Sequence, residues 1–245
     1  MIVNAQENGW EIIFQRNHAL LAGSIACEIH PDFRPPHWVE TLSAIIEHDD
    51  GQVDWSEHPH ISDTGRPMDF TMYEFDIEQA KRVINEAKYK SQWITLLVSM
   101  HVTSLYTPVA SKSAELRQLL KDQVQLQKQL LKTFSLKEEE MKTYYRFLRW
   151  CDECSLILCQ NRLINKQQKI EIGSLHGKKT NFIQRTKEDT VQVDPWCFTS
   201  GSFKVSAEVY KIDQLTFASS QELKKMIESV QPEIRYWEFQ KPPVL

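Results

Sequence analysis

Glycine is scarce in this chain, with only seven among 245 residues. Glycine is the residue that most readily adopts the backbone conformations of tight turns, so its scarcity favours a helix-rich chain with few such turns. Basic charge is not in excess either, because the formal net charge is −4. A chain without a basic field lacks the electrostatic attraction that nucleic acids and anionic membranes provide. We therefore expect no nucleic-acid partner and no membrane partner.

Long apolar runs are also missing. No run approaches the roughly 20 residues that a membrane-spanning helix needs, and the N-terminus has no signal-peptide pattern. The five cysteines are an odd number, which favours reduced thiols over a disulfide framework. These absences predict a cytoplasmic protein. The 41% hydrophobic and 25% charged residues that are present are typical of a soluble globular chain.

Hydrophobic periodicity predicts an α+β fold that is mainly α. A 3.6-residue period favours helices between residues 17 and 162, whereas alternation with period two begins after residue 165. Asn17 is the predicted N-cap of the first helix, and Ser135-Leu-Lys-Glu138 is a capping-box pattern at the start of the last long helix. The turn signal Glu7-Asn8-Gly9 between apolar segments predicts a hairpin near the N-terminus. We expect a helical domain over residues 17–162, an antiparallel β appendage over residues 166–245 with one short helix, and a hairpin over residues 1–16 that joins this appendage.

Residues 51–75 show no period and predict a long loop. Loops of this length are usually functional or disordered, and Trp55, Phe70 and Tyr73 could anchor this one as an ordered loop. We expect the loop to border a pocket, with Arg66 or Asp63 facing it. An arginine can bind a phosphate through two parallel hydrogen bonds. A surface arginine in a turn is the alternative for Arg66.

The stretch around His48 and Asp49 ends an apolar helical segment. Adjacent residues of a helix point about 100° apart, so the two side chains can converge on one point between helices. Asp49 continues the apolar stripe of Trp38, Leu42 and Ile45. A carboxylate in such a setting is costly unless it is paired or bound to a metal. The alternative is a helix end capped by glycine, with the carboxylates of Asp49 and Asp50 in solvent.

Four predicted helices each place a side chain that can bind metal in an apolar setting. These side chains are His18, the pair His48 and Asp49, His101 and Asp152. A single buried histidine is more often an ordinary core residue, and a single buried aspartate is more often a cap or an ion-pair partner. Charged residues are almost never buried without a partner, however. A divalent cation would stabilise all of these groups together.

This order of residues resembles the HD-domain superfamily of metal-dependent phosphohydrolases over residues 17–162. The segments His48-Asp-Asp-Gly and Thr64-Gly-Arg-Pro, with Asn17-His-Ala-Leu-Leu-Ala-Gly, are similar to an uncharacterised bacterial HD-like family. The resemblance implies an HD-like helical bundle in which His18, His48, Asp49 and Asp152 bind a divalent metal such as Mn, Fe, Zn or Ni. It further implies hydrolysis of a small phosphoester, with nucleotides among the candidate substrates.

In that hypothesis Asp49 or a neighbouring carboxylate accepts a proton, while His101 and Arg66 hold the phosphate. The superfamily commonly has two histidines before the last Asp, whereas here only His101 lies on a suitable helix and His58 and His60 fall in the loop. Two alternatives stay open, a di-iron oxygenase and a non-catalytic binding or interaction module. The β region could also mediate a homo-oligomer.

Three further features have less specific patterns. Asp50 and Asp54 could bind a second metal or act as a base, although as loop carboxylates they are more simply solvated. Cys151 and Cys154 have a spacing found in zinc sites, but they lie inside a predicted helix without a second such pair. We interpret these cysteines as core residues.

Overall fold

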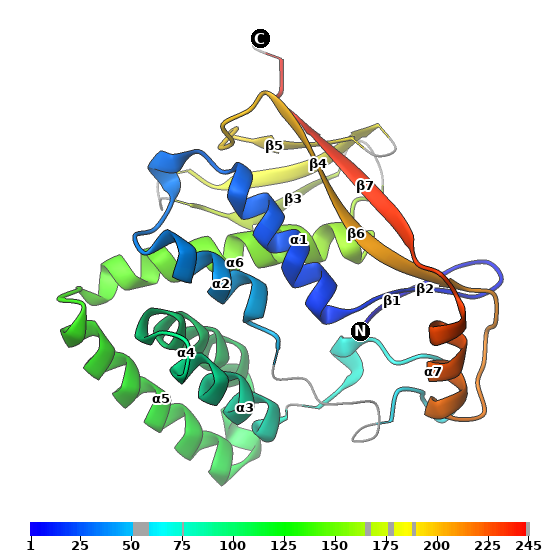
Figure 1. The fold of residues 1–245 in the computed structure, drawn as a ribbon, viewed down its shortest axis with the longest axis horizontal. Coiled ribbons are helices and arrows are strands. Elements are labelled where there is room, and N and C mark those ends of the chain that lie inside the picture. The colour runs from blue at the N-terminus through cyan, green and yellow to red at the C-terminus, as the bar shows by residue number, and fades with distance from the viewer. Residues whose placement is uncertain (51–58, 75, 165–167, 176–178, 188–189, 244–245) are drawn as a thin grey trace.

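The computed structural model describes residues 1–50, 59–74, 76–164, 168–175, 179–187 and 190–243 (Figure 1). Within these ranges the helices are α1 (Gln15–Glu28), α2 (Trp38–Glu47), α3 (Ile77–Lys88), α4 (Gln92–Tyr106), α5 (Ala114–Thr133), α6 (Glu138–Cys159) and α7 (Ser220–Ser229). The strands are β1 (Ile2–Ala5), β2 (Trp10–Ile13), β3 (Lys169–Gly173), β4 (Asn181–Lys187), β5 (Thr190–Asp194), β6 (Ser202–Ile212) and β7 (Glu233–Gln240).

All seven strands belong to one curled, mixed sheet that forms half of a barrel. Its strand order is β1-β2-β6-β7-β5-β4-β3. Neighbouring strands are antiparallel except β5 and β7, which run parallel with Thr190 opposite Glu238. The N-terminal hairpin enters the sheet through β2, which pairs with β6 and places Trp10 opposite Ile212. The predicted antiparallel β region is therefore a mixed sheet that includes both ends of the described chain.

The prediction of an HD-like helical bundle with a β appendage is wrong. Helices and strands share one cluster of buried side chains, in which Leu21 and Leu148 of the helices join Val193, Val205 and Trp237 of the sheet. α1 packs against β6 and α6 packs against β3. The physical reason is that the buried face of the sheet needs a covering layer, and these two helices provide it.

Close packing between α1 and α2 fixes the relative position of these two helices. At Gly23 an added Cβ would lie 2.6 Å from Cγ1 of Ile46, so the glycine permits a close approach. α4 is tied to α2 by the indole nitrogen of Trp93, which donates to Oγ1 of Thr41 at 2.8 Å. By length and composition alone, the described segment Gln92–Lys112 could cross a membrane. In the fold, however, α4 packs against α2, α3, α5 and α6.

Two helix starts differ from the sequence prediction. α1 begins at Gln15, and the side chain of Asn17 accepts a hydrogen bond from the Glu208 backbone of β6 instead of capping the helix. α6 begins at Glu138, where the backbone N–H of Lys137 donates to the Glu140 carboxylate. In both cases a short polar side chain fits the capping pattern but does not cap the helix. At α1 a tertiary contact engages that side chain, and at α6 the neighbouring Glu140 satisfies the backbone instead.

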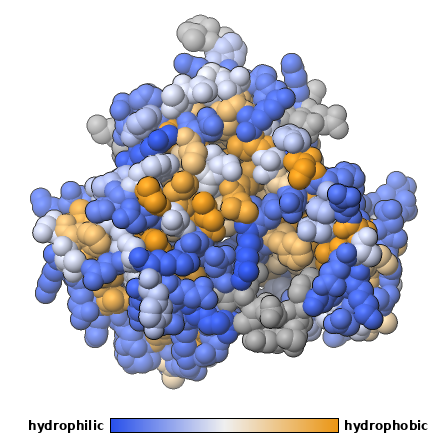
Figure 2. All heavy atoms as spheres, viewed as in Figure 1, coloured by the Kyte–Doolittle hydropathy of each residue, from blue (hydrophilic) through white to orange (hydrophobic). Residues whose placement is uncertain are grey.

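The surface view shows where the helices meet solvent. Figure 2 shows mainly hydrophilic side chains over α5, whereas hydrophobic side chains gather over α1 and α2 on the same face. α7 covers a second, smaller apolar cluster at the hairpin end of the sheet, made of Met1, Ile12, Ile212, Phe217, Leu223 and Ile227. The hairpin and the C-terminal part of the described chain thus stabilise each other.

Candidate metal centre

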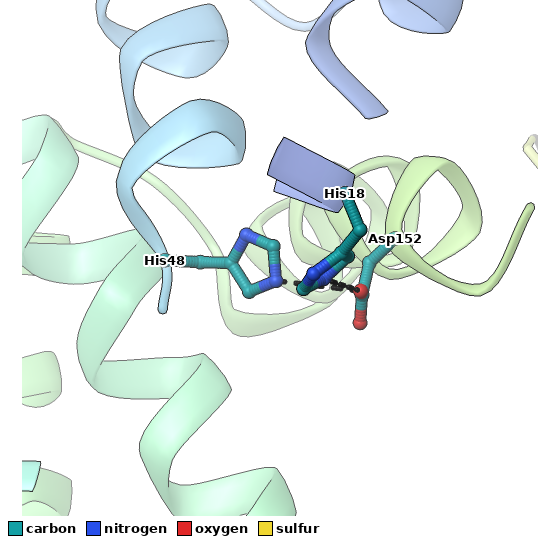
Figure 3. Close-up of side chains that lie close together, drawn as sticks. All are labelled: His18, His48 and Asp152. Carbon is teal, nitrogen blue, oxygen red and sulfur yellow. Dashed lines mark ion pairs between the residues drawn. The ribbon is translucent and has the colours of Figure 1, made fainter. Parts of the chain in front are cut away.

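Four side chains from three parts of the chain converge between α1, α2 and α6. His18 lies in the first half of α1, on the face that also buries Leu21 and Ala22. Asp152 lies inside α6. His48 and Asp49 directly follow the last residue of α2. In Figure 3 the rings of His18 and His48 point toward the carboxylate of Asp152.

α2 ends one residue before the His-Asp pair, so the pair lies in a turn rather than on the helix. The turn is closed by the backbone N–H of Asp50, which donates to the Glu47 carbonyl at 3.0 Å. Nε2 of His48 lies 3.6 Å from Oδ2 of Asp49, so the two adjacent side chains do face one point. Gly51, the cap in the alternative interpretation, falls outside the described residues.

The candidate histidine nitrogens lie at similar distances from the candidate carboxylate oxygens. Nε2 of His18 lies 3.5 Å from Oδ2 of Asp49 and 3.4 Å from Oδ1 of Asp152. Nε2 of His48 lies 3.3 Å from the same Asp152 oxygen. Most N–H···O hydrogen bonds are shorter, about 2.7–3.2 Å. Two ligands about 2.1 Å from one ion at a tetrahedral angle would lie about 3.4 Å apart. The spacing is thus that of ligands around a shared ion.

Several of these atoms are buried without a hydrogen bond. Both ring nitrogens of His18 and Oδ1 of Asp152 have no hydrogen-bond partner among the described residues. The side chain of His18 is 1% exposed, that of Asp152 14% and that of Asp49 18%. Buried polar atoms normally have a partner, because leaving one unsatisfied costs about 1–3 kcal/mol. A cation at this centre would satisfy Nε2 of His18 and Oδ1 of Asp152.

The backbone orients the ring of His48. Its Nδ1 lies 2.7 Å from the Ile45 carbonyl, which can only accept, so Nδ1–H donates and Nε2 faces the carboxylates. Such a bond on the second nitrogen is typical of metal-binding histidines. Two groups of ligand atoms lie within 4.8 Å of one another, namely His18, His48 and Asp152, and His48, Asp49 and His101. Because both groups must use Nε2 of His48, we treat them as one site.

The carboxylates favour positive charge at the centre. Burial alone lowers the pKa of His48, but the Asp49 and Asp152 carboxylates outweigh it and raise the pKa above its usual value. Burial would raise the pKa of Asp152, yet His48 and His18 hold it well below its usual range. By contrast, burial and the neighbouring His48 lower the pKa of His101 to about 4, so His101 is neutral near pH 7.

The comparisons with known proteins give a family but no activity. The model of the family described as "Protein of unknown function (DUF3891)" matches residues 1–214. The chain belongs to this family. The DUF3891 match spans β1 to β6 and α1 to α6, so it contains the whole His/Asp centre. Neither a curated protein nor a solved structure shows significant similarity to the chain.

The structure gives two of the predicted loop residues, Arg66 and His60, contacts other than with the His/Asp centre. Arg66 is exposed in a tight turn, where Gly65 has a φ of +76° and its carbonyl accepts from the backbone of Phe217. Nδ1 of His60 instead lies 3.2 Å from the Tyr73 hydroxyl. Asp54 and His58 fall outside the described residues.

Other sequence candidates have plain structural partners. Asp50 lies 3.5 Å from Nε of Arg16, an ion pair at the rim of the α2 turn. Cys151 and Cys154 are free and buried in α6.

Two side chains on the same face of α6 as Asp152 were missed in the sequence. The hydroxyl of Tyr145 lies 3.4 Å from Nδ1 of His101. Arg149 is exposed on the same helix. Tyr145, Arg149 and Asp152 follow at intervals of four and three residues, which places them on one helix face. This spacing from the candidate ligand Asp152 was the sequence signal that could have found both.

Proposed function

We propose that this protein binds one divalent metal ion through His18, His48, Asp49 and Asp152 and hydrolyses a phosphoester. The observation that carries the proposal is the spacing of 3.3–3.6 Å between two histidine nitrogens and two carboxylate oxygens, all buried or largely buried. Two imidazoles and two carboxylates form a donor set that suits Mn, Fe, Zn or Ni. The resemblance to HD-domain phosphohydrolases supports the reaction type, and nucleotides are candidate substrates.

A metal bound in such a site lowers the pKa of its water and polarises a phosphoryl oxygen. The protein groups then have separate tasks. His18, His48 and Asp152 hold the ion from buried positions on α1, the α2 turn and α6. Asp49 is the more exposed of the two carboxylate ligands, and its second carboxylate oxygen can take a proton from attacking water. His101, kept neutral by burial, can hydrogen-bond the phosphate.

Metal analysis is the decisive experiment. Purified protein is stripped with a chelator, equilibrated separately with Mn, Fe, Zn or Ni, and measured by elemental analysis. We expect one ion per chain, and metal-dependent phosphate release from p-nitrophenyl phosphate or nucleotides. Absence of bound metal in every case would refute the proposal and favour a binding or interaction module. Iron binding with oxygen consumption and no phosphate release would indicate an oxygenase.

A further inference from the structure

One face of α6 carries Tyr145, Arg149 and Asp152, at intervals of four and three residues. Asp152 is a proposed metal ligand, and Tyr145, seven residues earlier, reaches His101 through its hydroxyl at 3.4 Å. Arg149 lies between them in sequence, four residues after Tyr145 and three before Asp152. With a rise of about 1.5 Å per residue, its Cα is about 4.5 Å along the helix axis from that of Asp152. A flexible arginine side chain can span this distance.

The charge of Arg149 is not matched by an acidic group. Among the described residues it forms no salt bridge and no side-chain hydrogen bond, although it is exposed. Its neighbours on α6 are engaged, because Lys142 pairs with Glu138 and Glu139 and Arg146 donates to Thr143. A long cation beside a functional centre, without an acidic partner, can accept an anionic ligand.

Arg149 also lies within electrostatic range of the centre. The pKa of His101 is lowered chiefly by burial and by His48, and the charge of Arg149 acts in the same direction. His101 and Asp152 both border the proposed ion. The electrostatic effect of Arg149 on His101 therefore agrees with the helical spacing, which places Arg149 close to Asp152.

Charge balance indicates what such an arginine would bind. The carboxylates of Asp49 and Asp152 together carry two negative charges, which balance those of a divalent ion. A phosphate therefore meets no net positive charge from these groups. We propose that Arg149 supplies it, binding the substrate phosphate through two oxygens beside the metal. This assignment rests on the proposed metal centre and gives Arg149 the role that the sequence suggested for Arg66.

The test uses inorganic phosphate as the probe. Phosphate is titrated calorimetrically into manganese-loaded wild-type protein and into Arg149→Gln, whose metal content is measured in parallel. We expect the substitution to weaken phosphate binding about 10- to 100-fold, as for loss of a charged hydrogen-bond donor. Metal content and melting temperature should stay unchanged, because Arg149 is exposed. Arg149→Lys should recover part of the affinity, since it keeps the charge but not the planar fork.

Arg146→Gln is the matched control, because it removes the same charge from the same helix one turn earlier. It should bind phosphate with the wild-type Kd. Wild-type phosphate affinity in metal-loaded Arg149→Gln would overturn the assignment and leave the metal centre standing. Loss of metal from Arg149→Gln, an equal loss of affinity in Arg146→Gln, or no phosphate binding by metal-loaded wild type would also overturn it. A wild-type protein that binds no metal would refute the proposed function itself.

Discussion

Replacing Asp152 by Asn removes one charge from the proposed metal centre while keeping the size of the side chain. Asp152 contacts both histidines, with Oδ1 at 3.4 Å from His18 and 3.3 Å from His48. The Asn side chain retains one oxygen that can accept a hydrogen bond. The substitution therefore tests the charge on Asp152 rather than its packing in α6.

The expected loss of metal affinity follows from Coulomb's law. A carboxylate charge about 2.1 Å from a divalent ion is attracted by about 4 kcal/mol even at the dielectric constant of water. Because about 1.4 kcal/mol corresponds to a tenfold change in affinity, this is nearly a thousandfold. The side chain of Asp152 is only 14% exposed, so the local dielectric constant is lower than that of water. The figure is thus a lower limit for the charge alone.

Thermal unfolding with and without metal provides the assay. At a free metal concentration of about 100 times Kd, the wild type should gain about 2.7 kcal/mol, which raises Tm by roughly 5–10 °C in a chain of this size. Asp152→Asn should show almost none of this shift and retain no metal in elemental analysis. In chelator its Tm should stay within a few degrees of wild type, since no metal is then lost.

The matched control is Asp122→Asn, the same substitution at an exposed position of α5. It should keep the full metal-dependent shift. Wild-type metal content and a wild-type shift in Asp152→Asn would show that the carboxylate is not an essential ligand, and our interpretation of the 3.3–3.6 Å spacing would be wrong.

Three further predictions concern packing. Gly23→Ala should lower the free energy of unfolding by about 1–3 kcal/mol and weaken metal binding without altering a ligand, because the added Cβ meets Ile46 and separates α1 from α2; failure of Ile46→Ala to restore both would contradict this. Ile183→Ala in β4 should destabilise the protein by about 2–5 kcal/mol, with the circular dichroism of the helices and tryptophan fluorescence changing in one transition because the core is shared; separate transitions would argue against a shared core. A thiol reagent should rapidly modify only the exposed Cys27 in the native protein, because burial raises the pKa of the four other thiols. Rapid modification of two thiols per chain would contradict this prediction.

Local patterns predicted much of the secondary structure. The 3.6-residue spacing of Ile77, Ala80 and Val83 marks α3, whose Asp76 side chain caps it by accepting from the Gln79 backbone. The alternation of Val205, Ala207 and Val209 marks β6. These patterns are visible because period and capping depend on residues only a few positions apart.

The candidate site was also accessible from sequence, as a set of polar residues in apolar helical segments. The residues His18, His48, Asp49 and Asp152 were found because burying such groups without partners is unfavourable. Their spacing was not predictable, since it depends on how α1, the α2 turn and α6 cross. The metal itself stays a prediction.

The tertiary structure alone decided the architecture. The sequences of β5 and β7 do not indicate that the two strands run parallel. Thr190 and Glu238 are far apart in the sequence, and they become neighbours only when the tertiary structure forms. The same holds for the covering of the sheet: an apolar face on α6 shows that something packs there, but not whether it is a helix or a strand. Asn17 illustrates this most directly. The sequence marked it as a helix cap, whereas the close approach of β6 turned its side chain into a partner of the Glu208 backbone.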